Sequence, residues 1–167
     1  MQKQWEGSVH IDAPVGQVFP YVADFYRHPE WDRVILSVEK TKEGDSSGAG
    51  AEWKVYETCE LFSLGPPGAH VKQGTGLAKR VVKEVVPNKM VAWHTHPIPQ
   101  LGVSTDYLVR IEPDGDGTKV TQQVTVNLPG VVDKVARLVA KNLDSNLRQH
   151  RPQSLQRLET LVTRETH

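Results

Sequence analysis

The fold is decided by an opening stretch that reads VHIDAPVGQVFPYVADFYRHPEW, residues 9–31. It begins with apolar Val9 and Ile11 on either side of polar His10, an alternation that predicts a short strand. The apolar residues that follow are spaced three and four apart, which is the spacing of a helix. A strand followed directly by helical structure is therefore predicted, and the rest of the chain is interpreted from this start.

Proline and aspartate set the limits of the predicted helices. Asp12 can cap the first helix, and Pro14 suits its first turn, where a missing N–H leaves no hydrogen bond unmade. Pro20 falls too late for that role and is expected to kink or end the helix. A second short helix is predicted around residues 29–32.

The middle of the chain has the pattern of strands. Apolar and polar residues alternate in six successive segments, at about residues 34–39, 52–61, 77–86, 90–96, 105–111 and 119–126. Pro87-Asn88 suits a tight turn, and Asp114-Gly115-Asp116-Gly117 is a strong hairpin signal. Connections this short predict antiparallel neighbours.

The chain ends in one long helical pattern. Apolar residues recur at helical spacing from Val131 to Val162, and Pro152 is expected to kink the helix near residues 148–151. The element order is a strand, two short helices, a run of antiparallel strands and a long amphipathic helix. This order predicts an α+β fold with the helices on one face of a curved sheet.

Composition excludes several classes of protein. The 167 residues include 20 Lys and Arg and 20 Asp and Glu, so the formal net charge is zero and a broad nucleic-acid-binding surface is not expected. No apolar run is long enough to span a bilayer, and the first residues do not resemble a secretory signal. The single cysteine, Cys59, cannot form an internal disulfide. We therefore expect a cytoplasmic protein, a monomer or homodimer without integral membrane association, with one domain over residues 1–167.

Several short motifs point to a known group. The first are VHIDAP at 9–14, YVADF at 21–25 and PEW at 29–31. Later ones are VPNKMVAW at 86–93, GTKVT at 117–121, LPG at 128–130 and LQRLE at 155–159. Together they resemble the START-like, or SRPBCC, superfamily, and within it the polyketide cyclase/dehydratase and lipid-transport branch.

The resemblance implies a more definite architecture than periodicity does. It implies a helix-grip fold, in which a curved seven-stranded antiparallel sheet wraps around the long C-terminal helix, with two short helices after the first strand. Members of the superfamily hold apolar or amphipathic ligands between sheet and helix. They include lipid carriers, receptors and aromatase/cyclases, so the fold alone names no reaction.

Strand alternation predicts which polar side chains point inward. Glu57 is in phase with Trp53 and Val55, so its carboxylate is expected to face the interior, where desolvation raises its pKa. A ligand-contacting group or a general acid/base would explain this placement. A salt bridge at the open end of the sheet, or a bulge that turns Glu57 outward, is the alternative.

The last two strands and the helix offer further polar candidates. Tyr107 and Gln122 are in phase with apolar neighbours, so each can donate a hydrogen bond from an apolar wall. Tyr107 is equally typical of a core aromatic, and Gln122 of an edge position. Asn146 and His150 lie four apart on the helix and interrupt its apolar stripe, and His150 can titrate near neutrality. The alternative is that Pro152 rotates this turn of the helix toward solvent.

The tryptophans, two histidines, the cysteine and one loop can each be interpreted as functional or as purely structural. Trp31, Trp53 and Trp93 can line an aromatic-binding pocket or fill the core. His94 and His96 share a strand face, but zinc needs further ligands, so no metal site is predicted. Cys59 is interpreted as buried filler. The loop at residues 62–74, rich in glycine and proline, is either a lid or a passive connection.

Three functions are consistent with the sequence. The first is binding or transport of a small hydrophobic or aromatic ligand, without a cofactor. The second is a polyketide cyclase/dehydratase-type enzyme that uses Glu57 or His150 for proton transfer. The third is a protein-interaction module built on the long helix. The ligand-binding candidates are Trp31, Trp53, Glu57, Trp93, Tyr107, Gln122, Asn146 and His150.

Overall fold

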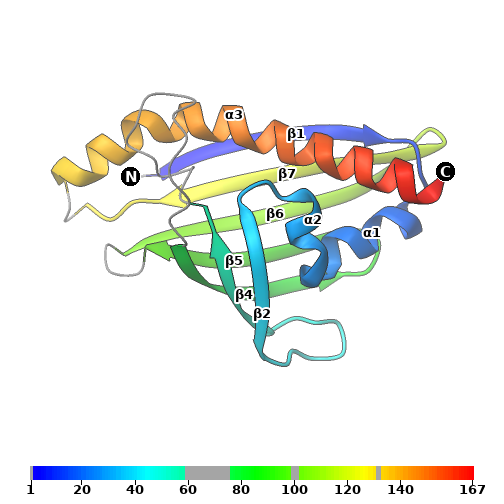
Figure 1. The fold of residues 1–167 in the computed structure, drawn as a ribbon, viewed down its shortest axis with the longest axis horizontal. Coiled ribbons are helices and arrows are strands. Elements are labelled where there is room, and N and C mark those ends of the chain that lie inside the picture. The colour runs from blue at the N-terminus through cyan, green and yellow to red at the C-terminus, as the bar shows by residue number, and fades with distance from the viewer. Residues whose placement is uncertain (1, 59–75, 99–101, 131–132) are drawn as a thin grey trace.

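A computed structural model describes residues 2–58, 76–98, 102–130 and 133–167. Its strands form an antiparallel sheet in the order β1-β7-β6-β5-β4-β3-β2 (Figure 1). The strands are β1 (Gln2–Ile11), β2 (Ile35–Lys42), β3 (Glu52–Glu57), β4 (Gly76–Val86), β5 (Met90–Ile98), β6 (Val103–Asp114) and β7 (Gly117–Asn127).

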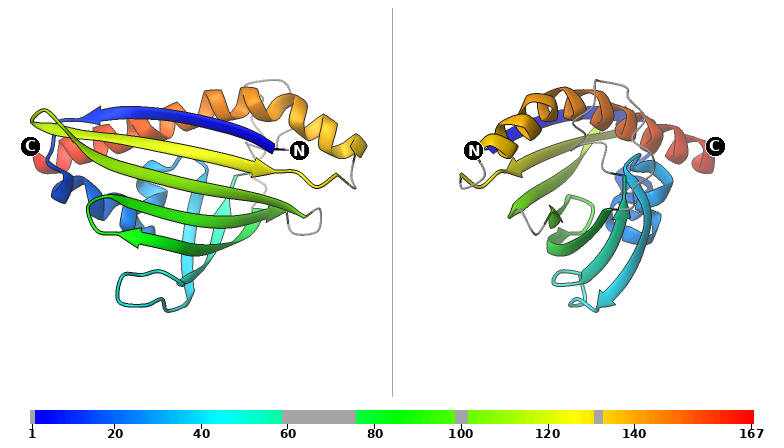
Figure 2. Two further views of the ribbon diagram at one scale, coloured as in Figure 1. Left: turned by 180° about the vertical axis from the view of Figure 1, so that it is seen from behind. Right: turned by 60° about the vertical axis from the view of Figure 1, so that its left-hand side comes forward.

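The helices lie along one side of this sheet. They are α1 (Val15–Ala23), the 3-10 turn η1 (Phe25–Arg27), α2 (His28–Trp31) and α3 (Asp133–Thr166). Figure 2 shows the sheet curling around that side, with α3 running along its length and packing against β1. The α+β helix-grip fold expected from the sequence is therefore confirmed.

The ends of the predicted helices are corrected in detail. Asp12 does not cap α1, because the cap position is Pro14, which makes no side-chain hydrogen bond there. Pro20 does not end α1, which continues to Ala23. The residue four before Pro20 is Gly16, the residue type whose backbone adjusts most easily to a proline ring. Pro152 likewise lies inside α3, which runs on to its end at Thr166.

Strand parity holds along parts of the sheet and is broken locally elsewhere. Inward and outward positions alternate along β3 and β6 and in the second half of β7 as predicted, whereas the register of β4 shifts between Val82 and Glu84. In β2 the register shifts between Ile35 and Ser37, so Val34 and Ile35 are both buried and Leu36 is exposed. A bulge explains this change, because one extra residue in a strand inverts the faces beyond it.

A hydrophobic cluster lies between sheet and helices. It joins residues from the strands and from α1, α2 and α3, including Val22, Trp31, Val109, Leu147 and Leu158. Because this cluster is apolar, polar residues on the inner face of the sheet need an explanation.

No described helix has a segment that is both long and apolar enough to cross a membrane.

Candidate functional site

Polar and charged side chains are buried together with this apolar cluster. We call the following set the interior polar cluster: His28, Asp32, Glu57, Arg80, Tyr107, Gln122, Asn146, His150 and Arg151. All except Glu57 are at most 6% exposed, and Glu57 is half-buried at the end of β3. Charged side chains are seldom buried unless they are paired, so their partners decide what the cluster can do.

Asp32 and Arg151 form a buried ion pair between α2 and α3. Two guanidinium nitrogens of Arg151 donate to the Asp32 carboxylate at 2.7 and 3.2 Å. Burial alone would raise the pKa of Asp32, but the charge and hydrogen bonds of Arg151 outweigh it and hold the pKa below its usual value. The Ser154 hydroxyl lies 3.4 Å from the same carboxylate and accepts from the backbone N–H of Arg33. Both carboxylate oxygens of Asp32 thus accept from Arg151, and this ion pair is structural.

His28 and Arg80 form a second buried contact of a different kind. His28 Nε2 lies 2.7 Å from the Val22 carbonyl oxygen, and its Nδ1 lies 3.0 Å from Arg80 Nη1. A carbonyl oxygen can only accept, so Nε2 carries the proton and Nδ1 accepts from Arg80. Burial, together with the Arg80 charge, lowers the pKa of His28 to about 3. His28 is therefore a neutral acceptor that positions Arg80 without compensating its charge.

Arg80 is held among aromatic rings. Its Cζ lies 5.2 Å from the ring centroid of Trp93, 5.4 Å from that of Phe25 and 5.8 Å from that of Tyr107. Guanidinium groups are attracted to aromatic faces at such distances. Desolvation lowers the pKa of Arg80. Among the described residues no carboxylate forms an ion pair with Arg80, so it is a buried cation without a paired anion.

A polar row crosses the inner face of the sheet at Arg80. Arg80 is paired in register with Thr95 on β5, and Thr95 is paired with Thr105 on β6. Both threonines are buried. Within the part of the chain that the structure describes, Arg80 Nε and both threonine hydroxyls have no hydrogen-bond partner. Buried polar atoms are nearly always paired, so this row is suited to contact a polar atom of a bound molecule.

Glu57 has a pKa near neutrality. Desolvation raises the pKa of Glu57 to about 7, against the opposing charge of Arg80 and with a smaller contribution from Asp32. The inward orientation predicted from strand alternation is consistent with this environment. A carboxyl group with such a pKa can exchange a proton at physiological pH.

Tyr107 lies beside Arg80 as part of an aromatic stack. Its ring is stacked on Trp93 with centroids 5.2 Å apart and planes inclined by 11°. Burial, with smaller contributions from neighbouring charges, raises the pKa of Tyr107 to about 12. Tyr107 is therefore a protonated hydroxyl at neutral pH and acts as a hydrogen-bond donor, not a base.

The eight sequence-predicted site residues are all on the inner side of the fold. Glu57 and Tyr107 lie in the electrostatic environment of Arg80. Trp53 and Trp93 belong to the surrounding aromatic cluster, and Trp31 packs edge-on against His28. Gln122 is fully buried on β7, and both of its amide atoms lack a partner among the described residues. Asn146 and His150 are buried on α3, which excludes their rotation into solvent at Pro152.

Sequence reasoning missed the charged centre of the cluster. Arg80 alternates in phase with Ala78 and Val82, so the parity rule that found Glu57 would also have found it. Arg151 follows Leu147 by four residues in the apolar stripe of α3, which is an equally readable signal. His28 and Asp32 lie in and after a four-residue helix, where no periodicity is available.

Several other candidates lie outside the cluster. His94 is half-buried, and its Nδ1 lies 2.5 Å from the Asp106 carboxylate. Its ring is 4.5 Å from that of His96, but no group of three possible metal ligands occurs among the described residues. Cys59 and the 62–74 loop lie outside the described residues, so their predicted roles are not tested.

Comparison with known proteins places this geometry in a family context. A family model described as "Polyketide cyclase / dehydrase and lipid transport" matches residues 2–162. No curated protein sequence matches the chain. Similarity to known proteins at the level of sequence is therefore shown by the family model.

Solved structures match the fold at low sequence identity. The Zhui aromatase/cyclase from Streptomyces sp. R1128 superposes with a TM-score of 0.74 at 15% identity, over 100% of this chain and 97% of that one. Ara h 8.0201 gives a TM-score of 0.69 at 15% identity, over 98% and 99% of the two chains. A START superfamily protein from Mycobacterium smegmatis gives 0.65 at 15% identity, over 96% and 97%. These likenesses concern the fold.

Removal of one partner of the buried ion pair should be strongly destabilising. Asp32→Asn leaves Arg151 charged and unpaired, so we expect a loss on the order of 3–5 kcal/mol in the free energy of unfolding, measured by urea denaturation. Adding Arg151→Met to Asp32→Asn should restore most of this loss. The control is Glu30→Gln on the same helix, which alters an exposed ion pair and should change stability by less than about 1 kcal/mol. A double variant as unstable as the single one would contradict this prediction.

The raised pKa of Glu57 predicts a pH-dependent stability. Between an ordinary glutamate pKa of about 4.5 and a folded-state pKa of about 7, the folded protein holds a proton that the unfolded chain has lost. The free energy of unfolding therefore falls as pH rises through this range. Glu57→Gln should equal the native protein near pH 4.5 and exceed it by on the order of 2 kcal/mol at pH 8. The matched control is the same change at the exposed Glu112. A stability difference between Glu57→Gln and the native protein that does not vary with pH would be evidence against a raised pKa of Glu57.

Proposed function

Because the chain belongs to the polyketide cyclase/dehydrase and lipid transport family, we propose that it binds or transports a small hydrophobic or aromatic ligand between the sheet and α3. The observation that carries this proposal is Arg80. It is a buried cation among aromatic rings, without a carboxylate partner in the described chain. An apolar ligand with one acidic or carbonyl oxygen would supply the acceptor that Arg80 lacks.

Further residues support a ligand that is mainly apolar. Trp53, Trp93 and Tyr107 offer large flat surfaces, and burial of a ligand against them contributes about 25 cal/mol per Å² of apolar area. Gln122, Thr95 and Thr105 add polar atoms that have no partner among the described residues. Such a wall, apolar with a few polar groups, is typical of small-molecule sites. Asn146 and His150 would complete it from α3.

The setting of the protein is part of the same proposal. We infer a cytoplasmic monomer or homodimer that acts without nucleic acid. The balanced charge and the single cysteine, Cys59, support this inference. A ligand that is sparingly soluble in water would explain why a cytoplasmic protein holds it in a buried site.

A matched pair of ligands tests the role of Arg80. Arg80→Met should weaken binding of 2-naphthoate by about 10- to 100-fold, because a charge-assisted hydrogen bond is lost, and should leave binding of 2-methylnaphthalene nearly unchanged. Binding is measured by quenching of tryptophan fluorescence, with circular dichroism as the check on folding. The control variant, Lys79→Met, changes an exposed residue on the opposite face of the same strand. An equal loss for both ligands, or no loss for naphthoate, would overturn the role of Arg80.

The second candidate function is a cyclase/dehydratase-type enzyme. The specific observation in its favour is Glu57, whose pKa of about 7 suits proton transfer at neutral pH. His150 is the other candidate for proton transfer and is buried on α3. In this role the interior would hold a reactive chain close to the geometry of reaction while Glu57 moved a proton.

Glu57→Gln separates the two functions. If Glu57 transfers a proton, the variant should lower the rate of cyclisation of a linear poly-β-ketone by at least about 100-fold with its affinity little changed. The rate is followed by the absorbance of the aromatic product. An unchanged rate in Glu57→Gln would exclude this role of Glu57, and product formation no faster than in buffer would favour the binding protein.

A further inference from the structure

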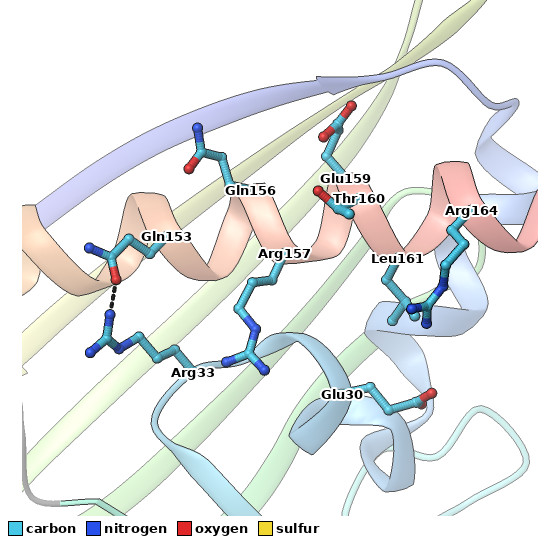
Figure 3. A pocket seen from close by; sticks show the side chains of 9 residues that line it. All are labelled: Glu30, Arg33, Gln153, Gln156, Arg157, Glu159, Thr160, Leu161 and Arg164. Carbon is cyan, nitrogen blue, oxygen red and sulfur yellow. Dashed lines mark hydrogen bonds between the residues drawn. The ribbon is translucent and has the colours of Figure 1, made fainter.

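A second candidate site lies on the surface, over the seam between α2 and α3. A groove of about 640 Å³ runs there, and its walls come from α2, the residues after it and the last four turns of α3. Figure 3 shows Arg157 and Arg164 extending from α3 toward α2, with Arg33 on the facing side. The groove therefore gathers three guanidinium groups from two segments that are far apart in the sequence.

The carboxylates of the groove do not balance the two arginines of α3. Glu30 is engaged by Arg27, whose Nε lies 2.9 Å from the Glu30 carboxylate. Glu159 extends from the side of α3 that faces away from α2 (Figure 3). No hydrogen bond or ion pair joins Arg157 or Arg164 to a residue in the described ranges. The positive charges of Arg157 and Arg164 repel each other, and an anion bound between them would replace this repulsion by attraction.

The facing wall of the groove is fixed in place. Arg33 donates through Nη1 to the side-chain oxygen of Gln153 (Figure 3). Its backbone N–H donates to Ser154 Oγ at 3.0 Å, and that hydroxyl lies against the buried Asp32–Arg151 pair. The groove thus has one wall anchored to the interior of the fold. An anion entering the groove would meet the hydrogen-bonded Arg33 on one side and the exposed Arg157 and Arg164 on the other.

Guanidinium geometry narrows the class of ligand. Arginine presents a planar fork of donors that matches phosphate and carboxylate oxygens, often by two parallel hydrogen bonds. Arg157 and Arg164 are seven residues apart, about 10 Å along the helix axis. A carboxylate offers two oxygens in one plane, whereas a phosphate offers three or more in different directions and up to two charges. A phosphate-bearing group therefore fits guanidinium groups that approach from several sides better than a carboxylate does.

We propose that the α2–α3 groove is a binding site for a phosphate-bearing small molecule, separate from the interior ligand site. Arg157 and Arg164 supply two exposed charges, and Arg33 with Gln153 forms the facing wall. The site is distinct from the interior polar cluster because Arg157 and Arg164 are exposed, while Arg80 and Arg151 are fully buried. This proposal does not depend on the identity of the interior ligand or on any reaction there.

Calorimetric titration with inorganic pyrophosphate tests the groove. At an ionic strength of about 20 mM, where surface charges are weakly screened, the native protein should bind one equivalent. Arg157→Gln and Arg164→Gln should each weaken the affinity by about fivefold, the scale of one exposed ion pair, and the double variant by more than either. The matched control is Arg148→Gln, an exposed arginine on the same helix that does not line the groove, and it should change the affinity by less than about twofold.

The same titration can overturn the proposal. Absence of saturable pyrophosphate binding to the native protein would do so. An equal loss in Arg148→Gln would also do so, because it would show a general attraction to positive charge on α3. Amide chemical-shift changes on pyrophosphate addition should centre on residues 153–164 of α3. Changes centred on β4 and β5 would assign the anion to the interior instead.

Discussion

The buried ion pair between Asp32 and Arg151 ties the shortest helix of the fold to the longest. Helix α2 has only four residues and cannot be stable alone, since the first turn of a helix is unfavourable to form. Asp32 holds its end, together with the indole N–H of Trp31, the last residue of α2, which donates to the Tyr21 carbonyl oxygen at 2.9 Å. At its start, His28 Nε2 donates to the Val22 carbonyl oxygen at 2.7 Å. The position of α2 then sets His28, and His28 sets Arg80. Asp32 and Arg151 are both fully desolvated, and neither can rotate away without losing its counter-charge. An ion pair on the surface would not fix α2 in this way, because water can replace either partner.

The interior polar cluster runs against the general preference for apolar cores. Most of the space between sheet and helices is filled by valine, leucine, isoleucine and aromatic residues, which are sufficient to drive folding. Arg80, Gln122 and two threonines add buried polar atoms whose desolvation opposes folding. Proteins commonly depart from local rules at functional sites and compensate elsewhere. The position of these atoms on neighbouring strands of one inner face, and not scattered through the core, makes a binding role the economical explanation.

Much of the fold could be predicted because its signals are periodic. Strand alternation located the inward face that carries Glu57, and helical spacing located the buried stripe of α3 that carries His150. The failures have local causes. The bulge at Ile35–Ser37 inverts parity without any glycine or proline to mark it, and Pro14 occupies the cap position that Asp12 was expected to fill. The centre of the site was harder to find, because His28 and Asp32 acquire their roles only through contacts with residues 52 and 119 positions away.

The charge state of the interior follows from how its residues are paired. Asp32 and Arg151 neutralise each other, and His28 stays neutral because burial and the Arg80 charge lower its pKa to about 3. Arg80 and Glu57 are not paired in this way. Together they carry one net positive charge while Glu57 is protonated, below its pKa of about 7, and none once Glu57 is ionised. The Arg80 charge favours the ionised form of Glu57. An acidic ligand oxygen bound at Arg80 would offset that charge and would thereby favour the protonated form of Glu57. Binding of an anion and uptake of a proton are then coupled by the same guanidinium group, because both Glu57 and the ligand respond to its field.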